Sequence, residues 1–193
     1  MNNNKSDKDL IIEYLDGSNE SLNILIRRYL QPIYNFVYTY IKDEEEAEDV
    51  VQEVFLKAWR NLKKFKKDKN FKTWIYKIAK NSSLDFLKKK KNITFSELNK
   101  NSYNNDVETF VDSIEDNDDL LPDEIYYKLE LQKDIEEVLD EIPVIYREVL
   151  NLYYINEFNF REISEILGVS INTVKSRYRR SLIILKEKIK NIT

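Results

Sequence analysis

The side chains best suited to chemistry lie near the C-terminus, on a predicted helix that starts after Ser170. Six of them are basic or hydrogen-bonding: Asn172, Thr173, Lys175, Arg177, Arg179 and Arg180. Ammonium and guanidinium groups bind phosphate oxygens, whereas amide and hydroxyl groups bond base edges. The chemistry that this set favours is recognition of duplex DNA.

Two helices joined by a turn would position these side chains. The first helix has an apolar stripe of Phe160, Ile163, Ile166 and Leu167, and the second has one of Val174, Tyr178, Leu182 and Leu185. Gly168 supplies a left-handed turn residue, Ser170 can cap the second helix, and Ser164 is small enough for a close crossing. The pattern is typical of a helix-turn-helix, whose second helix enters the major groove. The alternative is a surface hairpin with solvated basic side chains.

A second basic region lies at residues 61–91. The segment 61–70, NLKKFKKDKN, has no helical apolar stripe and surrounds Phe65 with lysines, so we predict a loop. The helix predicted after it has Trp74, Ile75, Ile78 and Ala79 inward, and has Tyr76, Lys77, Lys80 and Asn81 outward. Basic groups that follow phosphates and rings that stack on bases would suit single-stranded or melted DNA. A solvated lysine face fits these residues equally well.

Carboxylates gather on the helix predicted over 43–59. Asp43 and Glu46 have the spacing of a capping box, and the inward side is formed by Ala47, Val50, Val51, Val54, Phe55 and Trp59. Elsewhere on the cylinder lie Glu48, Asp49, Gln52 and Glu53. A divalent-metal site is one interpretation, but helix N-termini attract acids anyway and no phosphate loop accompanies these residues. We favour an acidic docking face for a basic protein partner.

The chain contains no cysteine and no histidine. Disulfides and thiolate metal sites are therefore excluded, and the commonest general base and zinc ligand are missing. We expect no catalytic residues, no metal and no other cofactor. The first ten residues, MNNNKSDKDL, lack an apolar signal core, and no apolar run approaches a membrane span. We expect a cytoplasmic protein that is not inserted in a membrane.

Charge is distributed unevenly along the chain. The formal net charge is −4, yet residues 55–91 carry +12, residues 92–125 carry −9 and residues 160–193 carry +5. Two basic segments separated by an acidic one suggest two modules that face nucleic acid. The middle segment is rich in Asn, Ser and Asp and reads as a flexible acidic linker.

Two glycines and three prolines in 193 residues favour an all-α fold. We predict a helix from Ser6 to Asp16, a second from about Asn19 with Leu30 in its stripe, and a restart of the chain at Pro32. Ile33, Phe36, Val37, Tyr40 and Ile41 should then be core, in preference to a base-stacking platform of tyrosines. Beyond the linker, one helix is predicted to end at Ile142 and another to begin with Pro143 at its first position. The expected architecture is two small helical domains, of which the C-terminal one has four helices including the helix-turn-helix.

Three segments together resemble one family. They are AEDVVQEVFLKAW at 47–59, TWIYKIAKN at 73–81, and DEIPVIYREVLNLYYINEFNFREISEILGVSINTVKSRYRRSL at 140–182. The first two resemble region 2, and the third resembles region 4, of the extracytoplasmic-function (ECF) subfamily of sigma-70 family RNA polymerase sigma factors. The resemblance implies a protein that binds core RNA polymerase, directs it to promoters and helps to open the duplex, without being an enzyme. It also implies a region 2-like domain at 1–91, a linker at 92–125 and a region 4-like domain at 126–193.

The resemblance also implies roles for individual residues, at the positions that match the family's motifs. The clamp helices of the largest polymerase subunit would contact Asp49, Gln52 and Glu53, and the flap of the second-largest subunit would be a further contact. The minus-ten element would be bound by the loop residues Phe65, Lys66, Lys67, Asp68, Lys69 and Asn70 and by the helix residues Tyr76, Lys77, Lys80 and Asn81. The minus-thirty-five duplex would be read by Ser170, Asn172, Thr173, Lys175, Ser176, Arg177 and Arg180. An anti-sigma factor is an expected partner.

The sequence departs from the family at a few positions. Ser164 replaces the usual alanine, and lysine often stands where relatives carry arginine, which weakens specific claims about bidentate guanine contacts. Two other classes of function stay open. A stand-alone helix-turn-helix regulator would not need the segments at 47–81, and a DNA-processing enzyme would need a nucleophile or metal cluster that the sequence does not supply.

Overall fold

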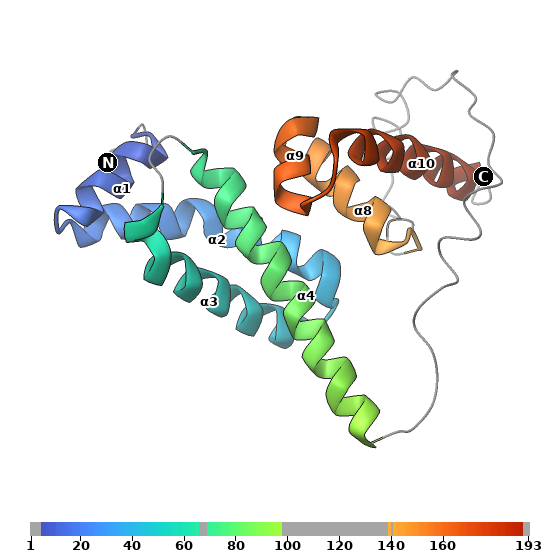
Figure 1. Ribbon diagram of the computed structural model, residues 1–193, viewed down its shortest axis with the longest axis horizontal. Coiled ribbons are helices and arrows are strands. Elements are labelled where there is room, and N and C mark those ends of the chain that lie inside the picture. Colours follow the sequence, from blue (N-terminus) through green and yellow to red (C-terminus); the bar gives the residue numbers. More distant parts are fainter. Residues whose placement is uncertain (1–4, 66–68, 98–138, 140, 191–193) are drawn as a thin grey trace. The chain divides into compact units, whose positions relative to one another are not determined.

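The computed structural model describes residues 5–65, 69–97, 139 and 141–190, and only the backbone at 92–97 and 189–190. These residues form helices and turns without a strand, which confirms the all-α prediction (Figure 1). They fall into two compact units, one made of the residues up to 93 with 161–169, the other of residues 94–97, 139, 141–160 and 170–190. Most of the predicted linker, from residue 98 to residue 125, lies outside the described residues.

The N-terminal unit contains α1 (Asp7–Leu15), α2 (Asn19–Ile41), α3 (Glu44–Asn61), the short 3-10 helix η1 (Leu62–Lys64) and α4 (Phe71–Glu97) as far as residue 93. A side-chain oxygen caps each of the first three helices, from Ser6, Ser18 and Asp43. The Asp43 cap accepts a hydrogen bond from the backbone N of Glu46 at 2.9 Å, as the capping pattern predicted. The segment 61–70 is not wholly a loop, because η1 continues from α3 and buries Leu62.

The core of this unit lies between α2, α3 and α4. The predicted stripe of α2 is buried, with Ile33, Phe36 and Val37 each at 0% exposure. Two details of α2 were predicted wrongly: the helix runs unbroken through Pro32, and Leu30 is 48% exposed. A proline removes one helical hydrogen bond, but the apolar face that is buried on both sides of it holds the helix together.

Side-chain contacts join α4 to its neighbours. The ring of Tyr76 lies 5.1 Å from that of Phe36 on α2, and Lys57 Nζ on α3 donates to Ser82 Oγ at 3.0 Å. Lys90 forms an ion pair with Glu46, 2.6 Å apart. The helix extends through Glu97, beyond the predicted domain end at residue 91.

The second unit is built around α8 (Val144–Leu150), the π-helix η2 (Asn151–Ile155) and α10 (Ile171–Lys190). Pro143 is the N-cap of α8, one position earlier than predicted. Five buried side chains from α8, α10 and the turn before α8 form the core: Ile142, Tyr146, Leu150, Leu182 and Leu185. Beside it, Tyr154 and Tyr178 share a hydrogen bond of 2.7 Å between their hydroxyl groups.

The short helix α9 (Phe160–Leu167) is connected to α10 by a tight turn. Gly168 has φ +70°, the left-handed conformation that the sequence predicted for it. Ser164 also stabilises this turn, because its Oγ donates to the carbonyl oxygen of Val169 at 2.7 Å. Ser170 Oγ then accepts from the backbone N of Thr173 at 3.0 Å, which confirms the predicted cap of α10.

Candidate functional site

One face of α3 presents polar side chains around an exposed leucine. Asp49 and Gln52 are exposed, whereas Glu53 is partly exposed and forms an ion pair with Lys57 at 2.8 Å. Leu56 is 53% exposed and follows Asp49 by seven residues, so all four residues lie on one side of the helix. We call Asp49, Gln52, Glu53 and Leu56 the α3 docking face. An apolar centre with a polar surround is the usual anatomy of a protein interface.

Sequence reasoning identified the polar members of this face and missed Leu56. The available signal was its position outside the buried stripe of α3, which contains Ala47, Val50, Val54 and Ala58. A leucine that helical periodicity places away from the stripe has no core position to occupy, so its exposure was predictable.

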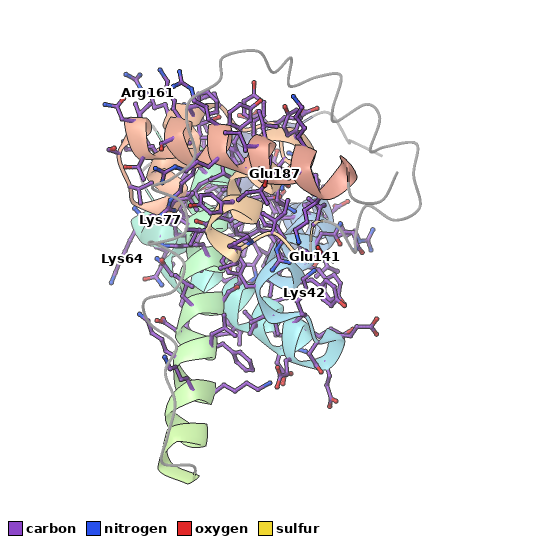
Figure 2. All side chains as sticks on the ribbon, turned by 90° about the vertical axis from the view of Figure 1, so that its right-hand side faces the viewer. Lys42, Lys64, Lys77, Glu141, Arg161 and Glu187 are labelled. Carbon is purple, nitrogen blue, oxygen red and sulfur yellow. The ribbon has the colours of Figure 1, made fainter. Side chains whose placement is uncertain are left out.

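A pocket of about 530 Å³ lies between the end of α3, η1 and α4. We call it the aromatic pocket, and its lining residues are Lys57, Asn61, Lys64, Phe65, Trp74, Ile78, Asn81 and Ser82. The ring centroids of Phe65 and Trp74 are 4.9 Å apart. Figure 2 shows Lys64 extending outward from this part of the unit. Flat apolar rings beside ammonium and amide groups suit an unstacked nucleobase and its phosphate.

The structure corrects the predicted orientations of three side chains on α4. Trp74 and Ile78 were predicted as core, but both are partly exposed and line the pocket. Tyr76 was predicted to point outward and is 0% exposed, against Phe36. Burial raises the pKa of the Tyr76 hydroxyl. Because α4 packs on more than one helix, its buried stripe is wider than a single-face pattern predicts.

The remaining predicted minus-ten residues have different environments. Lys69, Asn70, Lys77 and Asn81 are exposed, and Lys80 is partly exposed. The side-chain oxygen of Asn70 accepts from the backbone N of Thr73 at 3.4 Å, at the start of α4. Lys66, Lys67 and Asp68 lie outside the described residues.

A continuous row of side chains is exposed along α10. We call it the α10 strip, and it consists of Ile171, Asn172, Lys175, Ser176 and Arg179. The spacing of one, four, five and eight residues from Ile171 keeps the row on one side of the helix. Val174, Leu182 and Leu185 of the same helix are buried, as predicted. Ser170 is exposed beside the strip, and Thr173 and Arg180 are partly exposed.

Arg177, which was also expected to read the minus-thirty-five duplex, lies off this strip. Its Nη1 donates to Oε1 of Glu148 on α8 at 3.0 Å. The side chains of Arg177 and Glu148 are 24% and 7% exposed. The pattern of α10 alone could not reveal this pair, because its partner lies 29 residues earlier.

The described residues offer neither a metal site nor a membrane span. In the part of the chain that the structure describes, histidine, cysteine and carboxylate side chains form no group of three or more that could hold a metal ion. No helix among the same residues is sufficiently long and apolar to cross a bilayer.

Comparisons with known proteins identify both halves of the chain. The family model for sigma-70 region 2 matches residues 25–93, and the one for sigma-70 region 4 matches residues 132–185. The ECF RNA polymerase sigma factor SigW of Bacillus subtilis is 31% identical over 96% of this chain and 97% of its own length. The sigma factor SigV of the same bacterium is 30% identical over 83% of this chain and 86% of its own length.

A solved structure shows the same fold. It is the sigma factor RpoE in complex with the anti-sigma factor NepR from Bartonella quintana, and it matches with a TM-score of 0.65 at 23% identity. The match covers 89% of this chain and 98% of the RpoE chain. Together with the two family models in order, the near-complete match to SigW shows that the chain belongs to the ECF subfamily of the sigma-70 family of sigma factors.

Proposed function

We propose that this chain binds core RNA polymerase and directs it to promoters through three separate surfaces, without being an enzyme itself. The α3 docking face binds the polymerase, the aromatic pocket holds a base from the opened minus-ten element, and α10 reads the minus-thirty-five duplex. The observation that carries the proposal is the exposed Leu56 within the polar α3 docking face. A stand-alone DNA-binding regulator has no need of such a face.

The α3 docking face suits the clamp helices of the largest polymerase subunit. Leu56 would supply apolar contact, and Asp49 and Gln52 would supply charge and hydrogen bonds around it. A few central apolar residues usually dominate the binding free energy of an interface, and the polar surround supplies specificity. The flap of the second-largest subunit is proposed as a further contact of the chain.

The aromatic pocket suits a base that has left the stack. Unstacking costs a few kcal/mol, which contacts in a pocket must offset. Stacking of a base on an aromatic side chain contributes about 1–3 kcal/mol. Phe65 and Trp74 provide the rings. Lys64 and Lys77 are exposed, and we propose that their ammonium groups bind the phosphates next to the captured base. Lys80, Asn81 and the loop residues 66–70 complete the proposed minus-ten surface.

The helix α10 suits the major groove of the minus-thirty-five element. Ser170, Asn172, Thr173, Lys175, Ser176 and Arg180 are proposed to contact base edges or phosphates from its N-terminal half. Arg177 is assigned to positioning α10 instead, because Glu148 holds its guanidinium group.

The remaining assignments rest on the family. We propose a region 2 domain at 1–91, a linker at 92–125, a region 4 domain at 126–193, and a cytoplasmic location. An anti-sigma factor is proposed as a partner, because the similar RpoE chain was solved in complex with the anti-sigma factor NepR.

A pair of matched leucine variants tests the proposal. Leu56→Ala removes the apolar centre of the α3 docking face, whereas Leu30→Ala removes a leucine of similar exposure, 48%, from α2. We expect Leu56→Ala to weaken binding to purified core polymerase by about 1–2 kcal/mol, roughly 5- to 30-fold, and Leu30→Ala to leave it unchanged.

Transcription from genomic promoter fragments by the reconstituted polymerase provides the functional measurement. The Leu56→Ala reaction should recover at high concentrations of the variant, since only affinity is reduced. Equal polymerase affinity of Leu56→Ala and the unmodified chain would contradict the assignment of this face. Promoter binding that does not require polymerase would favour the stand-alone regulator.

A further inference from the structure

Ile171 is a large apolar side chain in an unusual place. It is the first residue of α10 and is 38% exposed, whereas Val174, three residues later, is fully buried. Among the described residues the other exposed large hydrophobics are Leu30, Leu56 and Ile155, none of which lies on α10. The fold therefore presents a single branched hydrocarbon at the start of the helix proposed to read DNA.

The turn before α10 fixes the backbone of Ile171. Ser170 Oγ accepts from Thr173 N at 3.0 Å, and the Ser170 carbonyl oxygen accepts from Val174 N at 3.0 Å. A β-branched side chain in a helix has one strongly preferred χ1 rotamer, so Ile171 loses little side-chain entropy when a partner covers it. Its direction is set before any partner binds.

The neighbours of Ile171 indicate the chemistry of that partner. Asn172, Lys175, Ser176 and Arg179 share its strip, and all four present hydrogen-bonding or cationic groups. A partner must then combine hydrogen-bonding edges and negative charge with an isolated apolar group. Duplex DNA meets this description, because the 5-methyl group of thymine is the apolar group that base pairs present in the major groove. A hydrophobic protein pocket would leave the polar members of the strip without bonding partners.

We infer that Ile171 determines specificity by contacting the 5-methyl group of one thymine in the duplex element read by α10. The inference rests on the proposed function and specifies which base, and which group of that base, Ile171 contacts. Burying one methyl group contributes about 0.8 kcal/mol, a factor of roughly four in affinity. The expected preference is thus modest and confined to one position.

The test uses the full chain assembled with core polymerase. A randomised duplex library is first selected for binding, which supplies a promoter probe with an upstream element. Each thymine in that element is then replaced in turn by 2′-deoxyuridine, which lacks the 5-methyl group and keeps the same hydrogen bonds. We expect one replacement to weaken binding of the unmodified chain about fourfold. The same replacement should have no effect on Ile171→Ala.

Three variants serve as controls. Ile155→Ala removes the other exposed isoleucine of the described residues and should keep the methyl effect. Lys175→Ala, which lowers affinity for every probe, should keep it as well. Ile171→Val keeps the β-branched apolar contact and should retain most of the effect. The inference would be overturned if Ile171→Ala kept the full methyl effect, or if no thymine in the element were sensitive to loss of its methyl group. Either result would leave the proposed promoter binding intact. Failure to select any duplex would instead count against the proposed function, and with it against this contact.

Discussion

The ion pair between Arg177 and Glu148 predicts that Arg177 affects promoter binding through the fold and not through a phosphate contact. Glu148 is buried on α8, and Arg177 Nη1 lies 3.0 Å from its Oε1. Arg177→Ala removes this guanidinium group from a carboxylate that water scarcely reaches. The pair joins α8 to α10, so its loss should loosen the helix proposed to enter the major groove.

The expected loss of stability follows from the burial of the pair. Removing one partner of a buried ion pair costs about 3–5 kcal/mol. The Arg177 side chain is 24% exposed, so solvent already screens part of the interaction. We therefore expect Arg177→Ala to lower the free energy of unfolding of the second unit by about 2–3 kcal/mol. The helices α8 and α10 should then open roughly 30- to 140-fold more often.

Hydrogen exchange measured by mass spectrometry can localise this change. Amides of α8 and α10 should exchange faster by that factor in Arg177→Ala. Trp59 and Trp74, the two tryptophans of the chain, both lie in the N-terminal unit. Urea unfolding followed by tryptophan fluorescence should therefore be unchanged. Lys188→Ala is the matched control, because its pair with Glu141 is far more exposed, at 38% and 60%, and should contribute less than about 1 kcal/mol.

The salt dependence of promoter binding separates the two roles of Arg177. A phosphate contact contributes about 0.9 to the slope of log affinity against log salt concentration. With polymerase bound and α10 folded, Arg177→Ala should keep the slope of the unmodified chain, whereas Lys175→Ala should lower it by about 0.9. Unchanged exchange of α8 and α10 together with a lowered slope for Arg177→Ala would refute the positioning role.

Three further predictions concern the N-terminal unit. Asp43→Ala removes the cap of α3 and should lower the free energy of unfolding by about 1 kcal/mol, seen as a lower urea midpoint in tryptophan fluorescence; an unchanged midpoint would contradict the observed cap. Burial raises the pKa of Tyr76, so its contribution to stability is complete below its ordinary pKa near 10 and is lost as the pH rises above that value. Tyr76→Phe should therefore unfold at a higher pH in an alkaline titration. Burial also raises the pKa of Tyr29, so part of the alkaline loss of stability should remain in this variant. Unfolding of Tyr76→Phe at the same pH as the unmodified chain would argue against the burial of Tyr76. Phe65→Ala should slow promoter opening by roughly 5- to 140-fold, because it removes one stacking contact, while duplex binding is kept. Opening is measured as permanganate reactivity of minus-ten thymines, and equal opening would show that Phe65 does not hold the base in the aromatic pocket.

Local sequence patterns were sufficient wherever a few neighbouring residues decide the structure. The Asp43 cap, the left-handed Gly168 and the Ser170 cap each depend on hydrogen bonds or dihedral angles within about one helical turn. The buried stripes of α2 and α10 followed from helical periodicity in the same way. The family resemblance also required only the linear order of the motifs.

Errors arose where a side chain's environment depends on residues distant in the chain. Tyr76 has a polar group and adjoins Lys77, yet it is buried because Phe36 of α2 packs on its ring. Leu30 fits the stripe pattern of α2, yet none of the helices among the described residues covers it, and it is 48% exposed. Pro32 locally disfavours a helix, and the buried face on both sides of it outweighs that preference.

The sequence by itself determined the helices, their caps, the basic and acidic segments and the sigma-70 motifs, because each of these depends on neighbours in the chain or on linear order. Only the tertiary structure decided that Phe65 and Trp74 share a pocket, that Tyr76 is buried against Phe36, and that Arg177 is held by Glu148. The physical reason is that exposure and pairing depend on which helices pack together. A one-dimensional pattern gives the side of a helix on which a residue lies but not what covers that side.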